Sequence, residues 1–404
     1  MRVTMSGKRA VTVAWAVGLA ASALAVLPAG AHTAGGAHYG DADLRRDLAA
    51  VRTAGGGDVN VVARVDAPGE VLRARYGTAG LGSVAPVPWD PEFRAASTSK
   101  TFTAVVVLQL VAEHKLSLDD TVQHWLPGTV SGNGNDGSKI TVRDLLQQTS
   151  GIYDYITDPV LQDQLLNHFD ENRYNATPPE QLVAIAMSHP PLFAPGPAGT
   201  PRQWAYSNTN YLLAAMIAQK AAGTGETWRD MVEHRVIAPL GLRDTYIPGE
   251  NPYLIGPHVR VTIDGPGGKP IDLTEHSFQH TADSGVVSTP SDLNTFFRAL
   301  ATGKLLPAAQ WREMRQTVPY DDLPVPPAGH QGGYGLGLRT VPLSCGGVYY
   351  MHEGDGLGVY GRPAVSADGR RAVTVSITST TALVDEDKLN TAVEELTDHA
   401  LCDR

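Results

Sequence analysis

Strand-like segments near both ends of the chain are the feature that most constrains its fold. Residues 58–65 and 70–76 are rich in β-branched side chains and flank the turn-like sequence Asp66-Ala-Pro-Gly69, so we expect the chain to open with this hairpin. Towards the other end, the strand-like runs are residues 347–351, 358–365 and 371–378. The pattern predicts an α+β fold in which one antiparallel sheet is built from both chain ends and flanked by helices.

A mostly helical region is expected between these two groups of strands. Residues 101–112 are apolar nearly all round, as in a helix that is buried in a core. Capping sequences at Thr141 and Pro290 start two further helices, and residues 385–401 predict a closing helix. The helical region is therefore an insertion into the sheet.

The first 31 residues indicate an export signal. Lys8 and Arg9 precede an apolar run over residues 10–27, and Ala29-Gly30-Ala31 offers a cleavage site. An uncleaved membrane anchor is the alternative, because the run is about as long as the shortest spanning helices. Cleavage would leave a secreted protein without a membrane segment, because no later run is apolar enough to span a bilayer.

We expect one domain after the leader, over residues 32–404. Its sheet part would span about 45–100 and 286–404, and its helical part about 101–285. A content of 42% hydrophobic and 18% charged residues is ordinary for a chain with a buried core.

Cys345 and Cys402 are the only cysteines of the sequence. In an oxidising compartment such a pair can close a loop, so export favours a disulfide between them, and two buried free thiols are the alternative.

Several classes of function find no support in the sequence. The net charge of −10, without a dense basic cluster, would repel a phosphate backbone and argues against a nucleic-acid partner. The glycine-rich stretch 132–137 has dinucleotide-fingerprint spacing, but no strand leads into it and we interpret it as a loop. Neither an H-E-x-x-H metal motif nor a G-x-S-x-G elbow occurs, so we expect no metal and no cofactor.

Ser97-Thr-Ser-Lys100 lies where the chain enters the apolar helix. The spacing of three puts both side chains on one helix face, and the helix N-terminus favours a developing oxyanion. A lysine in apolar surroundings has a lowered pKa, so Lys100 can take the proton of a nucleophilic Ser97. The plainer alternative is a capped helix whose lysine extends its charge to solvent.

Two further triplets carry candidate groups. Tyr206-Ser-Asn208 precedes a helix start, so Tyr206 could shuttle a proton and Asn208 could bind a substrate amide. His352-Glu-Gly354 follows the strand-like run 347–351, which places the triplet on a strand, so His352 could polarise or donate a proton while Gly354 lets a substrate backbone approach. A helix cap with a packed tyrosine, and a merely packed histidine, are the alternatives.

Taken in this order, the three triplets resemble those of the penicillin-binding proteins and serine β-lactamases. The segment Leu145-Leu-Gln-Gln-Thr-Ser-Gly-Ile-Tyr-Asp154 is also similar to a segment of that family, and the cysteine pair is similar to one in its secreted D-alanyl-D-alanine carboxypeptidases. The resemblance implies a β-lactamase-like fold. It also implies that Ser97 is acylated and that the oxyanion lies between the backbone amides of Ser97 and Asp355.

The residues expected to bind a substrate carboxylate depart from the family pattern. The resemblance implies that Arg339 binds a substrate carboxylate, but Glu353 stands where carboxypeptidases have threonine, and Asp355 follows closely. Two carboxylates would repel a free substrate C-terminus. Gln148 is a second departure, since the family usually has histidine there.

These observations predict a secreted acyl-serine hydrolase. The leading expectation is a D-alanyl-D-alanine carboxypeptidase that acts on peptidoglycan stem peptides or another small acyl substrate, with β-lactams as covalent inhibitors. An esterase, amidase or D-aminopeptidase on the same fold is the first alternative. The second is a β-lactam-binding or cell-wall-sensing module that does not turn over.

Overall fold

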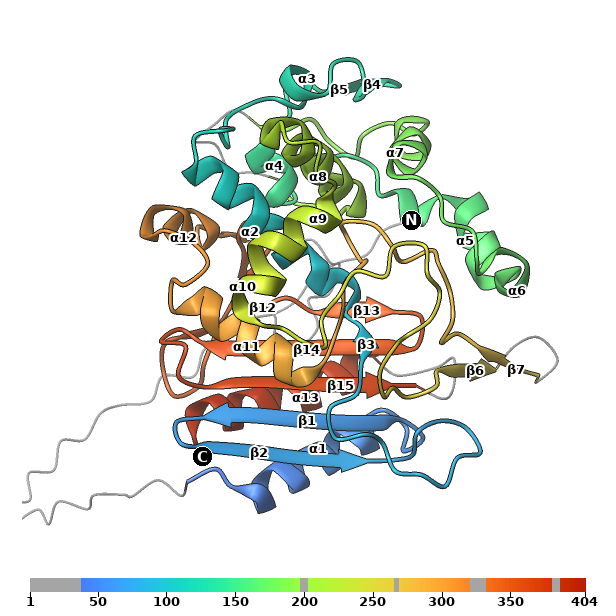
Figure 1. Cartoon of the computed structure of the whole chain (residues 1–404), viewed down its shortest axis with the longest axis vertical. Coiled ribbons are helices and arrows are strands. Elements are labelled where there is room, and N and C mark those ends of the chain that lie inside the picture. Colours follow the sequence, from blue (N-terminus) through green and yellow to red (C-terminus); the bar gives the residue numbers. More distant parts are fainter. Residues whose placement is uncertain (1–37, 197–202, 265–268, 320–331, 380–385) are drawn as a thin grey trace, which may run out of the picture. The chain divides into compact units, whose positions relative to one another are not determined.

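The computed structural model describes residues 38–196, 203–264, 269–319, 332–379 and 386–404 (Figure 1). The expected leader, residues 1–31, lies outside the described residues. Within the described ranges, no helix is both long and apolar enough to cross a membrane.

One antiparallel sheet joins the two ends of the chain, as the sequence predicts. From edge to edge its strands are β2 (Glu70–Tyr76), β1 (Asn60–Ala67), β15 (Ala372–Thr378), β14 (Val359–Ser366), β12 (Val348–Met351), β11 (Arg339–Pro342), β10 (Gly333–Tyr334) and β9 (Val318–Pro319), and β13 (Gly354–Gly356) pairs with the far end of β14. The join lies between β1 and β15, where Val61 pairs with Ile377. The expected hairpin of β1 and β2 and the predicted late strands are all present.

Helices cover both faces of this sheet, and the side chains of β15 show why. Val373, Val375 and Ile377 pack into an apolar cluster with α1 (Asp41–Ala54) and α13 (Glu386–Cys402). Thr374 lies on the opposite face, where its hydroxyl donates a 2.7 Å hydrogen bond to Asn294 of α11 (Pro290–Ala301). Because successive strand residues point to opposite faces, one strand serves both layers.

The helical part is built around α2 (Ser99–Ala112), which is buried along most of its length and packs against α8 (Asn208–Ala222). Its other helices are η1 (Ala96–Thr98), α3 (Val122–Trp125), α4 (Val142–Leu146), η2 (Tyr155–Thr157), α5 (Pro159–Leu166), α6 (Phe169–Asn172), α7 (Pro179–Met187), α9 (Trp228–Val232), η3 (Glu233–Ile237), α10 (Ala238–Leu240) and α12 (Ala308–Met314). Three two-stranded ribbons accompany them: β3 (Phe93–Arg94) with β8 (Val287–Ser288), β4 (Ser131–Gly132) with β5 (Asn135–Asp136), and β6 (Thr262–Asp264) with β7 (Pro270–Asp272). The α2 and α8 pair carries the site described below.

Two expectations about element order are wrong. The described chain opens with helix α1 rather than with the hairpin, and the helix packs its residues Leu44, Leu48 and Val51 against the sheet. Their spacing of four and three was a helical signal in the sequence. The second error concerns residues 241–289, where the described part contains β6, β7 and β8 and otherwise turns and irregular chain instead of helices.

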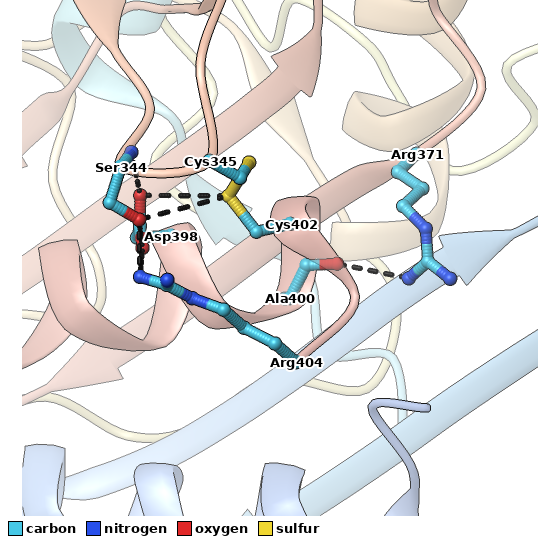
Figure 2. Close-up of a disulfide and its surroundings, with 7 residues drawn as sticks. All are labelled: Ser344, Cys345, Arg371, Asp398, Ala400, Cys402 and Arg404. Atoms are coloured by element: carbon cyan, nitrogen blue, oxygen red, sulfur yellow. Dashed lines mark hydrogen bonds and ion pairs between the residues drawn. A yellow bond between two sulfur atoms is a disulfide. The ribbon is translucent and has the colours of Figure 1, made fainter. Parts of the chain in front are cut away.

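Cys345 and Cys402 form a disulfide that ties the turn after β11 to the end of α13 (Figure 2). Beside it, the carboxylate of Asp398 accepts hydrogen bonds from the backbone N–H of Ser344, at 2.8 Å, and from the guanidinium of Arg404, at 2.7 Å. The disulfide and the Ser344 hydrogen bond connect α13 to the turn after β11. The sequence expectation of a bridge between the two cysteines agrees with the structure.

Candidate active site

Ser97 and Lys100 meet at the start of the central helix. Ser97 belongs to η1, which leads directly into α2, and Lys100 lies in the first turn of α2. The Nζ atom of Lys100 is 2.9 Å from the Oγ atom of Ser97. Ala96, just before the serine, has a φ of 44°, a left-handed conformation that is strained for a residue with a Cβ. The chain thus turns sharply into the helix and leaves Ser97 partly exposed.

The surroundings of Lys100 suit a neutral amine. Its side chain is fully buried, and burial lowers the pKa of Lys100 from 10.5 to about 8. Besides Ser97, Nζ contacts two oxygens that can only accept hydrogen bonds, Oδ1 of Asn208 at 2.7 Å and the backbone carbonyl of Asp283 at 3.0 Å. A neutral amine donates to both carbonyls and keeps its lone pair for the hydroxyl proton of Ser97. Lys100 can therefore act as the general base.

The Tyr206–Asn208 triplet lies where the chain enters α8, and its Asn208 contacts Lys100. Gln148 positions the triplet, because its Oε1 atom accepts the backbone N–H of Ser207 at 3.0 Å and the Nδ2 group of Asn210 at 2.6 Å. Gln148 itself has a φ of 62°. The residue that departs from the family pattern is therefore behind the triplet and holds it in place.

The pKa of Tyr206 is shifted in the opposite direction from that of Lys100. Burial raises the pKa of Tyr206 well above 10.0, although a hydrogen bond with Ser97 opposes this shift. Its phenol therefore stays protonated, while the amine of Lys100, 4.9 Å from the centre of the Tyr206 ring, loses its proton readily. Two neighbouring groups whose pKa values are pushed apart form an acid and base pair. Tyr206 is thus in place to return a proton to a leaving group.

His352 does not lie on the strand where the sequence placed it. It occupies, with Glu353, the break between β12 and β13, and its side chain is fully buried. Its ring nitrogens contact the backbone carbonyl of Glu353 at 2.8 Å and the hydroxyl of Tyr334 at 3.0 Å, and burial lowers the pKa of His352 to about 4. A neutral imidazole with both nitrogens engaged supports the cavity wall rather than donating a proton to substrate.

Gly354 is required for a different reason from the one the sequence suggested. A Cβ atom at this position would lie 2.0 Å from the backbone carbonyl oxygen of Ala95. The hydroxyl of Thr98 also donates a 3.0 Å hydrogen bond to the carbonyl of His352. The glycine therefore lets β13 pack onto η1, which brings the late strand beside Ser97; the space next to it holds protein backbone rather than substrate backbone.

A cavity of about 440 Å³ opens beside Ser97. Its wall includes most of the predicted residues, namely Ser97, Tyr206, Asn208, Arg339, Glu353 and Asp355. The other lining residues are largely apolar: Tyr155, Ile156, Leu161, Leu165, Thr177, Leu182, Trp204, Phe278, Gln279, Asp283 and Ser284. A concave apolar site with a few convergent polar groups is typical of small-ligand binding.

Two carboxylates of the cavity wall are held in ion pairs. Arg339 and Glu353 form a 2.6 Å ion pair, and Asp355 forms another with Arg362, also at 2.6 Å. Burial alone would raise the pKa of Glu353, but the guanidinium of Arg339 outweighs it and holds the pKa well below its usual range. Glu353 is therefore ionised, and the guanidinium expected to bind a substrate carboxylate already binds one from the protein.

Sequence reasoning missed two residues of the site, one that contacts Asn208 and one that contacts Lys100. Asp154 accepts both contacts of the Asn208 Nδ2 group, at 2.9 and 3.2 Å, and Asp283 supplies the carbonyl that binds Lys100. Asp154 ends the family-like segment noted above, so its position was a usable signal. No local pattern marks Asp283, because its contact is made by a backbone atom.

No candidate metal site emerges in the described part of the chain, where no group of three or more His, Cys, Asp or Glu side chains could hold an ion.

Comparison with known proteins identifies the family of the chain. Residues 44–398 match the family model described as Beta-lactamase. Penicillin-binding protein 4* of Bacillus subtilis is 28% identical over 174 residues, which cover 43% of this chain and 34% of that protein. Esterase EstB of Burkholderia gladioli is 34% identical over 198 residues, which cover 46% of each protein. The chain thus spans less than half the length of these curated relatives.

Among solved structures, a D-stereospecific amidohydrolase from Streptomyces sp. superposes with a TM-score of 0.74. It is 36% identical, and the match covers 85% of this chain and 97% of the amidohydrolase. The predicted fold, an antiparallel sheet flanked by helices with a helical insertion, is confirmed by the family match and by this superposition.

Proposed function

This chain belongs to the β-lactamase family of serine acyl-hydrolases, and from that premise we propose that it hydrolyses amides or esters of small amino acids with a free ammonium group and an apolar side chain. Ser97 attacks the carbonyl while Lys100 takes its proton, and Tyr206 protonates the leaving group and recovers a proton from Lys100. Water then cleaves the resulting Ser97 ester and releases the acid. The backbone amides of Ser97 and Asp355, which both line the cavity, bind the oxyanion.

The ion pair between Arg339 and Glu353 is the observation that carries the proposal. Three acidic residues line the cavity, namely Asp283, Glu353 and Asp355. Arg339 is paired with Glu353 and Arg362 with Asp355, so both guanidinium groups are already engaged by carboxylates of the protein. A substrate carboxylate about 5 Å from an uncompensated carboxylate is destabilised by about 3 kcal/mol at an effective dielectric constant near 20. An ammonium gains from the same charges, so the site favours a free amine over a free C-terminus.

The apolar wall supports a hydrophobic acyl side chain. Tyr155, Leu161, Leu182, Trp204 and Phe278 line the cavity that opens beside Ser97. Each CH₂ group that such a wall removes from water contributes about 0.8 kcal/mol to binding. Phenylalanine- and leucine-sized substrates are therefore expected to be preferred to alanine.

Similarity to a D-stereospecific amidohydrolase over nearly its full length supports the D configuration and an amide bond. Similarity to an esterase supports activity on activated esters. We therefore expect D-amino-acid amides and short D-peptides with a free N-terminus to be the preferred substrates.

The D-alanyl-D-alanine carboxypeptidase hypothesis is the second candidate. One observation favours it: Arg339 lines the same cavity as Ser97 and supplies a guanidinium. The two hypotheses differ in the end of the substrate that the charged groups bind. A carboxypeptidase needs the ion pair with Glu353 to open, whereas an aminopeptidase or amidase uses it as it stands.

Steady-state turnover of three substrates tests the proposal, namely D-phenylalaninamide, its N-acetyl derivative and diacetyl-L-lysyl-D-alanyl-D-alanine. We expect D-phenylalaninamide to give the highest kcat/KM, and acetylation of its amine to reduce that value at least roughly 10-fold. Faster turnover of the D-alanyl-D-alanine peptide would reverse the assignment. A single burst without turnover on any substrate would instead indicate a β-lactam-binding or sensing module.

We further propose that the protein is secreted after cleavage of residues 1–31. The charged and apolar pattern of the leader and the Cys345–Cys402 disulfide, which needs an oxidising compartment, support this. N-terminal sequencing of protein recovered from the culture medium of an expressing bacterium is expected to start near His32. An intact N-terminus in the cytosolic fraction would contradict export.

A further inference from the structure

We propose that Asp154 is a positioning residue that fixes the orientation of the Asn208 amide and thereby directs the lone pair of Lys100 at Ser97. This inference rests on the proposed acylation of Ser97. Asp154 would act through Asn208 and Lys100 and need not touch the reacting atoms.

The contacts form a continuous chain from Asp154 to the nucleophile. Both carboxylate oxygens of Asp154 lie within hydrogen-bond distance of the Asn208 Nδ2 group, at 2.9 and 3.2 Å. The Oδ1 atom of the same amide is 2.7 Å from the Lys100 Nζ atom, which is 2.9 Å from Ser97 Oγ. Each link is short enough to be a hydrogen bond.

An ionised carboxylate has no proton to donate, so it accepts only from the nitrogen end of an amide. Asp154 therefore holds Asn208 with its nitrogen away from Lys100 and its oxygen towards it. With the amide reversed, an N–H group would face the amine and use its lone pair as the acceptor. Lys100 would then have no electron pair left for the proton of Ser97.

Backbone contacts hold Asp154 at this point. Asp154 caps η2, accepting the N–H of Ile156, and the neighbouring carbonyl of Tyr153 accepts hydrogen bonds from Ser207 and Thr209. The segment that carries the carboxylate is thus joined directly to the segment that carries Asn208.

The charges around Lys100 and Asp154 predict a second effect of removing the Asp154 carboxylate, a change in the pKa of Lys100. Burial lowers the pKa of Lys100, and the carboxylates of Asp283, Asp154, Glu353 and Asp355 raise it. Burial raises the pKa of Asp154 to about 6, whereas Lys100 lowers it and Asp283 raises it. Removing the charge at position 154 removes one group that favours the protonated lysine, so deprotonation of Lys100 should occur at a lower pH.

The test compares Asp154→Asn with the unaltered protein by the rate of Ser97 acylation, using a fluorescent penicillin and p-nitrophenyl acetate. Asparagine can still cap η2 but can bind either end of the Asn208 amide. We expect the maximal rate to fall roughly 10- to 100-fold, as for other small misplacements of a reacting group. At the same time the ascending limb of the pH profile should move to lower pH, which a general loss of packing would not produce.

A double-mutant cycle with Asn208→Ala shows whether Asp154 acts through Asn208. Once Asn208 is removed, Asp154→Asn should change the remaining rate by less than about 2-fold. If Asp154→Asn does not fold, Asp154→Ser takes its place, because a serine hydroxyl can also cap η2. Asp158→Asn is the matched control, because Asp158 caps the neighbouring α5 and pairs with His189; its rate should equal that of the unaltered protein.

Equal losses from Asp154→Asn in the presence and absence of Asn208, or no loss at all, would overturn the positioning role while Ser97 is still acylated in the unaltered protein. Failure of the unaltered protein to be acylated by either probe would overturn the proposed function, and this inference with it.

Discussion

The amine of Lys100 lies 2.9 Å from the hydroxyl of Ser97 and is entirely shielded from solvent. The fold itself therefore brings the pair into contact. Its geometry depends on a single helical turn, whereas its protonation depends on burial and on carboxylates from three other segments.

The first prediction concerns the identity of the base. Lys100→Arg keeps a positive charge, but a guanidinium does not lose its proton in a protein. We expect kcat/KM for the preferred substrate to fall roughly 100- to 10,000-fold, the usual contribution of a general base. Lys115→Arg, on an exposed lysine paired with Glu113, is the control and should behave as the unaltered protein. Substantial activity of Lys100→Arg would exclude lysine as the base.

The second prediction is the pH dependence of the reaction. Because the neutral form of Lys100 is the active one and its pKa is about 8, kcat/KM for p-nitrophenyl acetate, a substrate without a titrating group, should be low at pH 6 and rise through pH 8 to a plateau. Tyr206 should cause no descending limb below pH 10, since burial holds its pKa well above that value. Stopped assays from pH 5 to 10, with circular dichroism at each pH to verify folding, measure the profile. A limb centred near pH 6 would assign the titrating group elsewhere.

The third prediction tests the close approach of β13 to η1. Gly354→Ala places a methyl group against the Ala95 carbonyl, so we expect a loss of about 1 to 3 kcal/mol in the free energy of unfolding and much slower acylation of Ser97. Gly356→Ala on the same strand is the matched control. Its new methyl group would first meet the end of the flexible Gln279 side chain, at 3.2 Å. Denaturant titrations should separate the two variants, and equal stabilities would contradict the packing argument.

The fourth prediction concerns the disulfide. Its sequence separation of 57 residues corresponds to about 4 kcal/mol in the chain-entropy model, so Cys345→Ser combined with Cys402→Ser should unfold at clearly lower denaturant concentration. Neither cysteine lines the cavity, so acylation at 25 °C should change by less than about 2-fold. Dithiothreitol should destabilise the unaltered protein and leave the serine variant unaffected. A large loss of acylation in the folded variant would show that α13 influences the site.

Local patterns were sufficient for much of the fold and for the central pair. Alternating β-branched residues predicted β1, β2, β14 and β15, and a spacing of three on a helix predicted the contact between Ser97 and Lys100. Helix α1 was missed although its apolar spacing was present in the sequence. Residues 241–289 belong to the region that was expected to be mostly helical, but their described part contains no helix.

The sequence by itself determined which groups could do chemistry, because neighbours within one helix or strand follow from its period. Only the tertiary structure decided the protonation and the hydrogen-bond partners of these groups. It buried His352 behind the cavity, paired Arg339 with Glu353, and brought Asp154 to Asn208 across 54 residues of chain. Protonation and hydrogen-bond orientation depend on burial and on partners distant in sequence, and packing alone creates both.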